Sequence, residues 1–336
     1  MAEIPNPSRW LYNRPSEGIA QDWYAQHSEV SILDMAVILC SPFRAWDGQS
    51  NVPYQLNHIT LTQNGIEVYP NGPELNQLWQ DLSADLKKRG ERNDSKSHLY
   101  SYSEAGDTLQ MVTSLSDWSR MALGPMLRDG KVPAHYRDDI LPREVPTVNG
   151  NAHVFDAALP NHLVLHLALL TADHHLILTT RSRTVAFEQG NISASVEQHV
   201  IPEHPLVDTI YSAVSTKLNG EAELKLTLRP ETLRIGGIII EPNVNNTGII
   251  VVGRCEEDSS QVGPELIGSS RRSEFAPNTP VRTMPMDQPE IWVPYFFNPN
   301  ATLHGTSRLR IVLAASYVNG YQPTLEALYQ GYLQEA

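Results

Sequence analysis

The stretch from residue 163 to residue 220 constrains the fold of this chain most, because it contains an ordered series of elements. An apolar run over 163–170 has the length of a buried strand, and a second run over 176–181 follows a polar turn, so the two predict a hairpin. After a loop, 205–218 has the spacing of an amphipathic helix, with one apolar face formed by Leu206, Ile210, Val214 and Leu218. The predicted order is therefore strand, strand, loop and helix.

This series, with more strands and a late helix after it, resembles the Nudix α/β/α sandwich over roughly 158–322. The loop sequence Gly190-Asn191-Ile192-Ser193-Ala194-Ser195 is similar to the Gly-x-Trp-Ser-x-Pro sequence that leads into the Nudix box. That box is a glycine, five residues, a glutamate, seven residues and then Arg-Glu-aliphatic-any-Glu-Glu-any-Gly. The resemblance implies a helix whose glutamates hold Mg²⁺ or Mn²⁺ against a diphosphate.

The glutamates of the box are missing from this chain. With Gly220 as the closing glycine, the Arg-Glu and Glu-Glu positions of the box become Ala213, Val214, Lys217 and Leu218. Asp208 is the only acidic residue in 205–219, so a shift of register does not restore the cluster. Glu203 matches the first glutamate only if Glu197 stands where the glycine should be. We therefore expect a degenerate Nudix box that holds no metal and supplies no catalytic residue.

The rest of the chain predicts two domains joined by a connector. Residues 1–128 are expected to form an α+β domain, with a helix over 74–89 and hairpins around Asn64-Gly65 and around 104–107. The core of that domain is expected around Leu75, Leu78, Trp79, Leu82 and Leu86. Four prolines and little periodicity indicate a connector over 129–160.

Residues 161–336 are expected to form the degenerate Nudix-like domain, which ends in C-terminal helices. Beyond the opening series, the apolar patterns predict strands over 224–228, 235–241, 248–254 and 291–296. They also predict helices over 306–317 and 324–333. The polar segment 256–288 reads as a long loop, which is functional or disordered at that length.

Charge and cysteine content limit the partners and the compartment. A formal net charge of −13 and a pI near 5.3 argue against general binding to nucleic acid or to anionic membranes. Cys40 and Cys255 are the only cysteines, and we interpret both as free thiols in a reducing compartment. No run of about twenty apolar residues occurs, and the N-terminus has no apolar segment of signal-peptide length. We therefore expect a cytoplasmic protein that spans no membrane.

The candidate ligand-binding residues lie after the hairpin. Arg181, Arg183, Phe187 and Glu197 are expected to line a cleft. Arginine suits bidentate contact with phosphate, and Phe187 would stack on a base. Ordinary surface charge explains the arginines equally well. The histidine pairs 174–175 and 199/204 lack the further ligands that a zinc site normally needs.

These features favour a non-catalytic protein that binds a nucleotide or another phosphorylated small molecule, or that acts as a regulatory or scaffold protein. No cofactor is expected. One alternative is a Nudix-type hydrolase of a nucleoside diphosphate derivative, with Mg²⁺ held by relocated carboxylates at Glu197, Glu203 and Glu241. Another is a purely structural subunit that contacts a protein partner through the 256–288 loop or the C-terminal helices.

Overall fold

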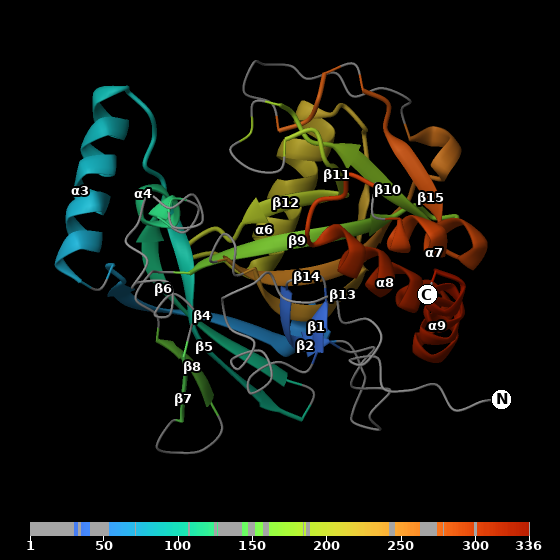
Figure 1. The fold of residues 1–336 in the computed structure, drawn as a ribbon, viewed down its shortest axis with the longest axis horizontal. Helices are drawn as coiled ribbons and strands as arrows, with labels where there is room; N and C mark the ends of the chain where they lie inside the picture. Colours follow the sequence, from blue (N-terminus) through green and yellow to red (C-terminus); the bar gives the residue numbers. More distant parts are fainter. Residues whose placement is uncertain are drawn as a thin grey trace.

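The computed structural model describes residues 30–32, 35–40, 54–70, 72–106, 108–123, 126, 143–146, 152–156, 161–183, 185, 189–241, 246–262, 274–277, 279–298 and 301–335. Within this part of the chain the protein is a mixed α/β structure with two β-sheets and helices packed against them (Figure 1). No helix in this part is long and apolar enough to cross a membrane.

The larger sheet contains the predicted hairpin at its centre. Its strands run in the order β1-β2-β13-β14-β9-β10-β11, and β12, β15 and β3 pair with β9, β10 and β13. Their bounds are β1 (Val30–Ile32), β2 (Met35–Cys40), β3 (Tyr54–Gln55), β9 (His162–Leu170), β10 (His175–Thr180), β11 (Ile192–Ala194), β12 (Val196–His199), β13 (Leu228–Glu241), β14 (Asn246–Cys255) and β15 (Arg282–Pro285). Strand β9 lies parallel to β14, and every residue of β9 is buried, as its near-continuous apolar run predicts.

Helices cover both faces of this sheet. Helix α6 (Leu206–Ser212) continues as the π-helix η4 (Ala213–Glu221), and the predicted apolar face of this pair is buried. It shares a core with alternate residues of β9, whereas the intervening residues of β9 pack with α7 (Pro289–Phe297), α8 (Ser307–Asn319) and α9 (Tyr321–Glu335). Because successive side chains of β9 point to opposite faces of the sheet, this strand contributes side chains to the core on each face. The predicted helix over 205–218 and the two predicted C-terminal helices are confirmed.

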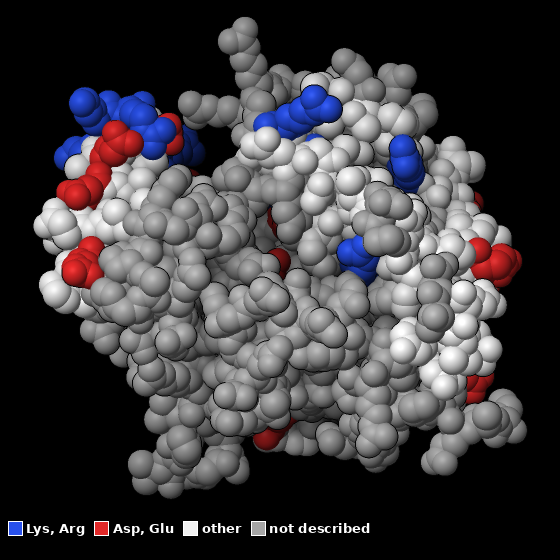
Figure 2. Space-filling view, viewed as in Figure 1, with Lys and Arg blue, Asp and Glu red and all other residues white. Residues whose placement is uncertain are grey.

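The smaller sheet has the order β4-β6-β5-β8-β7. Its strands are β4 (Ile59–Glu67), β5 (Ser95–Ala105), β6 (Thr108–Asp117), β7 (Arg143–Pro146) and β8 (Ala152–Asp156), and η2 (Leu56–His58), α3 (Pro73–Lys88) and α4 (Trp118–Met121) accompany them. The predicted helix over 74–89 and the hairpin around 104–107 are confirmed. Of the predicted stripe on α3, Leu75 and Leu86 are buried and the other members are partly exposed. Lysine and arginine gather with acidic residues at one end of α3, a mixture typical of a solvated helix face (Figure 2).

The two sheets share apolar contacts across the predicted domain boundaries. Leu99 and Met111 of the smaller sheet belong to the same core as Leu163 and Leu165 of β9. Strands β1, β2 and β3 join the larger sheet, and the predicted connector contributes β7 and β8 to the smaller one. The division at 128 and 160 stays a prediction, and strands from both sides of it pair with one another.

The predicted hairpin around Asn64-Gly65 is wrong. Strand β4 continues through these residues and lies parallel to β6. Gly65 has a φ of +73° at a bulge, where the register with β6 slips between Gln63 and Glu67. Oδ1 of Asn64 accepts a hydrogen bond from the backbone N–H of Ile66 at 2.9 Å. Asn-Gly suits the left-handed residue of a bulge as well as that of a turn, which explains the error.

Two predicted strands of the C-terminal part are also wrong. Residues 291–296 lie in α7, because Pro289 suits a first helical turn and Trp292, Val293 and Phe296 are buried at helical spacing. Residues 223–227 are irregular, since Glu223 and Lys225 have a φ of +57°. The side chain of Asn219 holds this segment through both backbone groups of Leu226, at 2.7 and 2.6 Å.

Within the predicted loop over 256–288, the described residues include the short helix η5 (Ser259–Gln261) and β15. Residues 263–273 lie outside the described part of the chain. The interface predicted for this loop stays a prediction.

Candidate functional site

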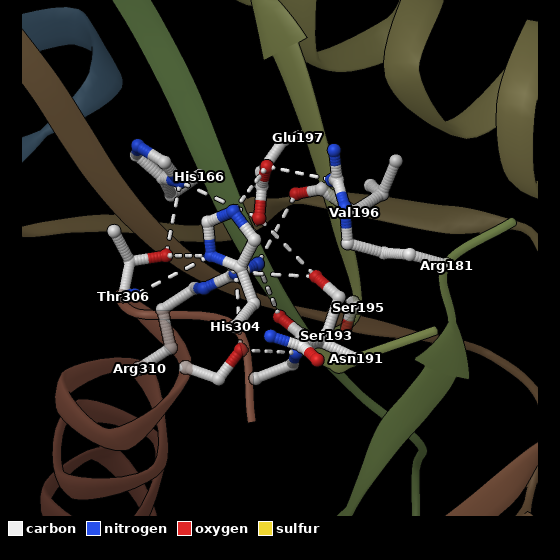
Figure 3. A network of polar contacts seen from close by, with 12 residues as sticks. His166, Arg181, Asn191, Ser193, Ser195, Val196, Glu197, His304, Thr306 and Arg310 are labelled. Carbon is white, nitrogen blue, oxygen red and sulfur yellow. Dashed lines mark hydrogen bonds and ion pairs between the residues drawn. The ribbon is translucent and has the colours of Figure 1, made fainter. Parts of the chain in front are cut away.

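Glu197 lies at the centre of a buried network of ion pairs (Figure 3). Strand β12 places it opposite His166 of β9. Its Oε1 lies 2.6 Å from Nη2 of Arg310, and its Oε2 lies 2.9 Å from Nη1 of Arg181 and 3.1 Å from Nε2 of His304. Two guanidinium groups and an imidazole therefore surround one carboxylate. We call Glu197, Arg181, Arg310, His304, His166, Thr306, Glu241, Glu274 and Lys217 the Glu197 network.

Arg310 connects helix α8 to strands β11 and β12 through hydrogen bonds. Its side chain is completely buried, although the flanking residues of α8 are apolar. Besides Glu197, it donates to the carbonyl of Ala194 at 2.8 Å and to the hydroxyls of Ser193 and Ser307 at 3.1 and 3.2 Å. These contacts satisfy both terminal nitrogens of the guanidinium, whereas Nε is buried without a partner among the described residues.

A chain of histidines links Glu197 to a second carboxylate. Oγ1 of Thr306 lies 3.2 Å from Nδ1 of His166 and 3.1 Å from Nδ1 of His304. Nε2 of His166 lies 3.3 Å from Oε2 of Glu241, at the end of β13. The groups thus run in the order Glu241, His166, Thr306, His304 and Glu197, and they connect strands β13, β9 and β12 with the residues that precede α8.

Lys217 joins the network from the helix that the resemblance identifies with the Nudix box. Its ammonium group contacts the carboxylate of Glu274 and the backbone carbonyl of Glu197. Glu274 also accepts a hydrogen bond from Nη1 of Arg181 at 3.2 Å. The lysine lies in the π-helical part of the helix, next to buried Leu218. The helix therefore contributes a cation, and no carboxylate, to this part of the network.

The surroundings keep both central carboxylates ionised. Burial raises the pKa of Glu197, but His304, Arg181 and Arg310 outweigh burial and hold this pKa well below its usual value. Burial raises the pKa of Glu241 too, and the charge of His166 outweighs it, so this pKa is lowered. Burial lowers the pKa of His166, but Glu241 and Glu197 more than compensate and raise it. The negative and positive groups of the network therefore stabilise each other's charged forms.

A second group of histidines comes from β5, β9 and β12, with His98 and His162 buried and His199 partly buried. We call His98, His162 and His199 the histidine cluster. The rings of His162 and His199 are 6.1 Å apart, and both ring nitrogens of His162 are buried with no hydrogen-bond partner in the described part of the chain. Burial lowers the pKa of His98 to about 4, against a hydrogen bond from its Nδ1 to the backbone carbonyl of Asn161, which raises the pKa. Burial is also the main cause that holds the pKa values of His162 and His199 well below the ordinary value.

The structure brings together only some of the residues predicted from the sequence. Arg181 and Glu197 form an ion pair, whereas Arg183 is exposed and Phe187 lies outside the described residues. Of the three carboxylates suggested as a relocated metal site, Glu197 and Glu241 both approach His166. Glu203 is exposed and lines a different cleft, beside β4.

The histidine pairs considered as metal ligands are also separated. The exposed side chain of His204 pairs with Asp208 at 3.2 Å, whereas His199 packs against His162. His175 contacts Asp173 in the turn between β9 and β10. In the part of the chain that the structure describes, no three His, Cys, Asp or Glu side chains are placed to share a metal ion.

Several members of the Glu197 network were missed by the sequence analysis, namely His304, Thr306, Arg310, Glu274 and Lys217. One signal was available. Arg310 interrupts an apolar stretch of helix α8, and a charged residue on a buried helix needs a buried partner. That partner could not be identified, because Glu197 is more than one hundred residues away in the sequence.

Replacing Gly248 by alanine is expected to destabilise the protein by about 1–3 kcal/mol, because the new methyl group would overpack the site. A Cβ atom there would lie 2.7 Å from Cδ2 of His166 and 2.7 Å from Cγ1 of Ile239. Chemical denaturation measures the loss. Gly220→Ala is the control, since its nearest neighbour would lie at 3.2 Å. Equal stability of the two variants would show that His166 is not packed against β14 as described.

Comparisons with known proteins give only distant similarities. No protein-family model matches the chain, and no curated protein is significantly similar in sequence. The Deinococcus radiodurans protein DR0079 is 17% identical with a TM-score of 0.31, over 51% of this chain and 95% of that one. A Nudix hydrolase from M. smegmatis, RenU, is 16% identical with a TM-score of 0.25, over 46% of this chain and 80% of that one.

A bifunctional NMN adenylyltransferase/ADP ribose pyrophosphatase from Francisella tularensis is 8% identical with a TM-score of 0.29. That match covers 47% of this chain and 42% of the other. TM-scores at this level do not establish a shared fold.

Proposed function

We propose that this chain is a non-catalytic regulatory or scaffold protein with a degenerate Nudix-like fold, and that it binds a phosphorylated small molecule. The observation that carries the proposal is the position of Lys217. Its helix presents an ammonium group to Glu274 and to the backbone of Glu197. A Nudix hydrolase would need a carboxylate there to hold its metal.

The residues present do not fit the Mg²⁺ or Mn²⁺ that the resemblance implies. A metal at Glu197 would lie next to Arg181 and Arg310, both within 3 Å of the carboxylate. Two unit charges 4 Å apart interact by about 4 kcal/mol at the effective dielectric of a protein, so a divalent ion at that distance would meet a repulsion of about twice that size from each cation. The cations of the network already supply the positive charge that a metal would bring.

The exposed Arg183 is the arginine that we propose for contact with a phosphorylated ligand. Arg181 is buried and already paired with Glu197 and Glu274. A phosphate would therefore reach Arg183 without disrupting the network, whereas it would have to displace a carboxylate from Arg181. The proposed contribution of Phe187 is stacking on a base.

The purified chain is expected to leave nucleoside diphosphate derivatives intact with or without Mg²⁺. Binding of such a ligand, measured by calorimetry or thermal shift, is expected to persist in EDTA, because the contact needs no metal. The Arg183→Ala variant should weaken binding about tenfold, the loss expected from one charge-assisted contact. Arg92→Ala, at another exposed arginine, is the control.

Metal-dependent turnover that Glu203→Gln abolishes would support the hydrolase with relocated carboxylates instead. Failure of every phosphorylated ligand to stabilise the chain would favour the purely structural subunit.

A further inference from the structure

A cleft of about 690 Å³ runs along one edge of the smaller sheet, apart from the Glu197 network. One wall consists of the consecutive residues 59–63 of β4, with Leu56, Gly65 and Thr113 of β6 beside them, and the other of residues 203–207. Side chains of a strand alternate between its two faces, so a cleft on one face would be lined by every second residue. A cleft lined by consecutive residues follows the edge of the strand, where its backbone groups point.

This edge of β4 is unpaired within the described part of the chain. Strand β4 is the terminal strand of the smaller sheet and pairs with β6 on its other edge. Residues 59–63 have the sequence Ile-Thr-Leu-Thr-Gln, which contains no charge and no proline. Exposed edges are normally protected by such residues or by bulges, because an open edge accepts another strand. Here the bulge at Gly65 comes only after these five residues.

The opposite wall sets the chemistry of an occupant. Pro205, Leu206 and Val207 make it apolar, and the exposed Glu203 adds a carboxylate. His204 contributes a ring that is already paired with Asp208. With a net charge of −13 on the chain, the cleft favours a cationic occupant over an anionic one.

We infer that the cleft binds an extended peptide segment of a partner protein, which adds to β4 as a further strand. The segment has apolar or β-branched residues at alternate positions and a lysine or arginine that meets Glu203. Five residues of a strand span about 17 Å, the length of the open edge from 59 to 63. Main-chain hydrogen bonds would supply most of the affinity, and the alternate side chains the specificity.

A second folded copy of the chain fits this cleft poorly. In a second copy, the edge of β4 is likewise flanked by residues 203–207. Pairing of the two β4 edges would therefore force both of these walls into the same space. An isolated peptide strand is thinner and enters the slot between β4 and that wall. The inference is independent of the proposed function, since it involves no member of the Glu197 network.

The probe is a series of fluorescent five-residue peptides in which valine, isoleucine or threonine alternates with lysine, and fluorescence anisotropy measures binding to the full chain. Two versions of the tightest binder carry N-methyl groups on its odd or on its even residues. A peptide strand forms hydrogen bonds to β4 through the backbone amides of alternate residues only. One version should therefore lose at least about tenfold in affinity while the other keeps its affinity.

The Glu203→Gln change should weaken binding of the lysine peptide by about two- to fivefold, as expected for the loss of an exposed ion pair. Binding of a version with norleucine in place of lysine should stay unchanged. Glu223→Gln, at another exposed glutamate, is the control. Lack of saturable binding by the series overturns the inference, as does equal binding of both methylated versions. Dimerisation that a Thr62→Lys change abolishes would also overturn it, because the occupant would then be a second copy.

Discussion

Replacing Arg310 by methionine is expected to lower the free energy of unfolding by about 3–5 kcal/mol, the largest effect of any single substitution in the Glu197 network. Methionine retains much of the volume of arginine, so the loss reports the missing charge and not a cavity. Without Arg310, the buried Glu197 loses its shortest ion pair, and Ser193 and Ala194 lose a donor. Urea denaturation of the variant and the wild type measures the difference.

The double variant Arg310→Met, Glu197→Gln provides the internal control. Because both groups belong to one network, its loss of stability should be smaller than the sum of the two single losses by about 1–3 kcal/mol. Arg183→Met, at an exposed arginine, should change stability little. A loss below about 1 kcal/mol for Arg310→Met, or strict additivity, would show that the ion pairs contribute little to the folded state.

Acidification is expected to unfold the protein through the histidine cluster. In the folded state burial lowers the pKa of His98 from 6.5 to about 4 and holds those of His162 and His199 well below 6.5. The unfolded chain therefore takes up protons that the folded chain excludes as the pH falls below 6.5. The stability from these groups is complete above that value and is lost as the pH falls through the folded pKa values. Three such protons correspond to about 4 kcal/mol per pH unit at the steepest point.

Other groups near the cluster do not reverse this effect. Lys96, Arg120 and Lys217 add positive charge beside it, which lowers these pKa values further, and Glu197 opposes them at His199. The pKa of His166 is raised, so its contribution to stability is fully present below pH 6.5 and is lost only at higher pH. Glu197 and Glu241 have lowered pKa values and lose their contribution only below 4.5. Among these described groups, the window between pH 6.5 and 4.5 therefore isolates the histidine cluster.

The measurement is the free energy of unfolding by urea across this window. The His162→Gln variant should reduce the pH slope by about one proton, whereas His204→Gln, at an exposed histidine, should not. A wild-type slope of less than one proton would mean that water or a counter-ion reaches the cluster and lets it charge in the folded state.

The strongest periodic patterns predicted the frame of the fold. The hairpin of β9 and β10 and the helix over 205–218 have apolar patterns that packing preserves, and helix α3 forms as predicted with two residues of its stripe buried. Errors arose where local signals fit two structures. Asn64-Gly65 suits a bulge as well as a turn, and the apolar run of α7 is too short for its period to distinguish helix from strand.

The site was harder to predict because its members meet only through the fold. The absence of an acidic cluster from residues 205–219 could be recognised from local sequence alone. The gathering of Lys217, Arg181 and Arg310 around the carboxylates could not, since these residues come from separate segments of the chain. Sequence spacing also grouped Glu203 with Glu197, whereas the left-handed backbone of Glu203 is part of a turn that leads away from the network.

The most direct test of the closed ion network is a titration of the chain with Mn²⁺ followed by electron paramagnetic resonance. We predict that the signal of free Mn²⁺ is not depleted by a stoichiometric site at Glu197. Wild type and Glu197→Gln should give the same titration, because Lys217, Arg181 and Arg310 already neutralise the carboxylates. One Mn²⁺ bound per chain by the wild type and lost in Glu197→Gln would contradict this prediction and would show a metal centre at this site.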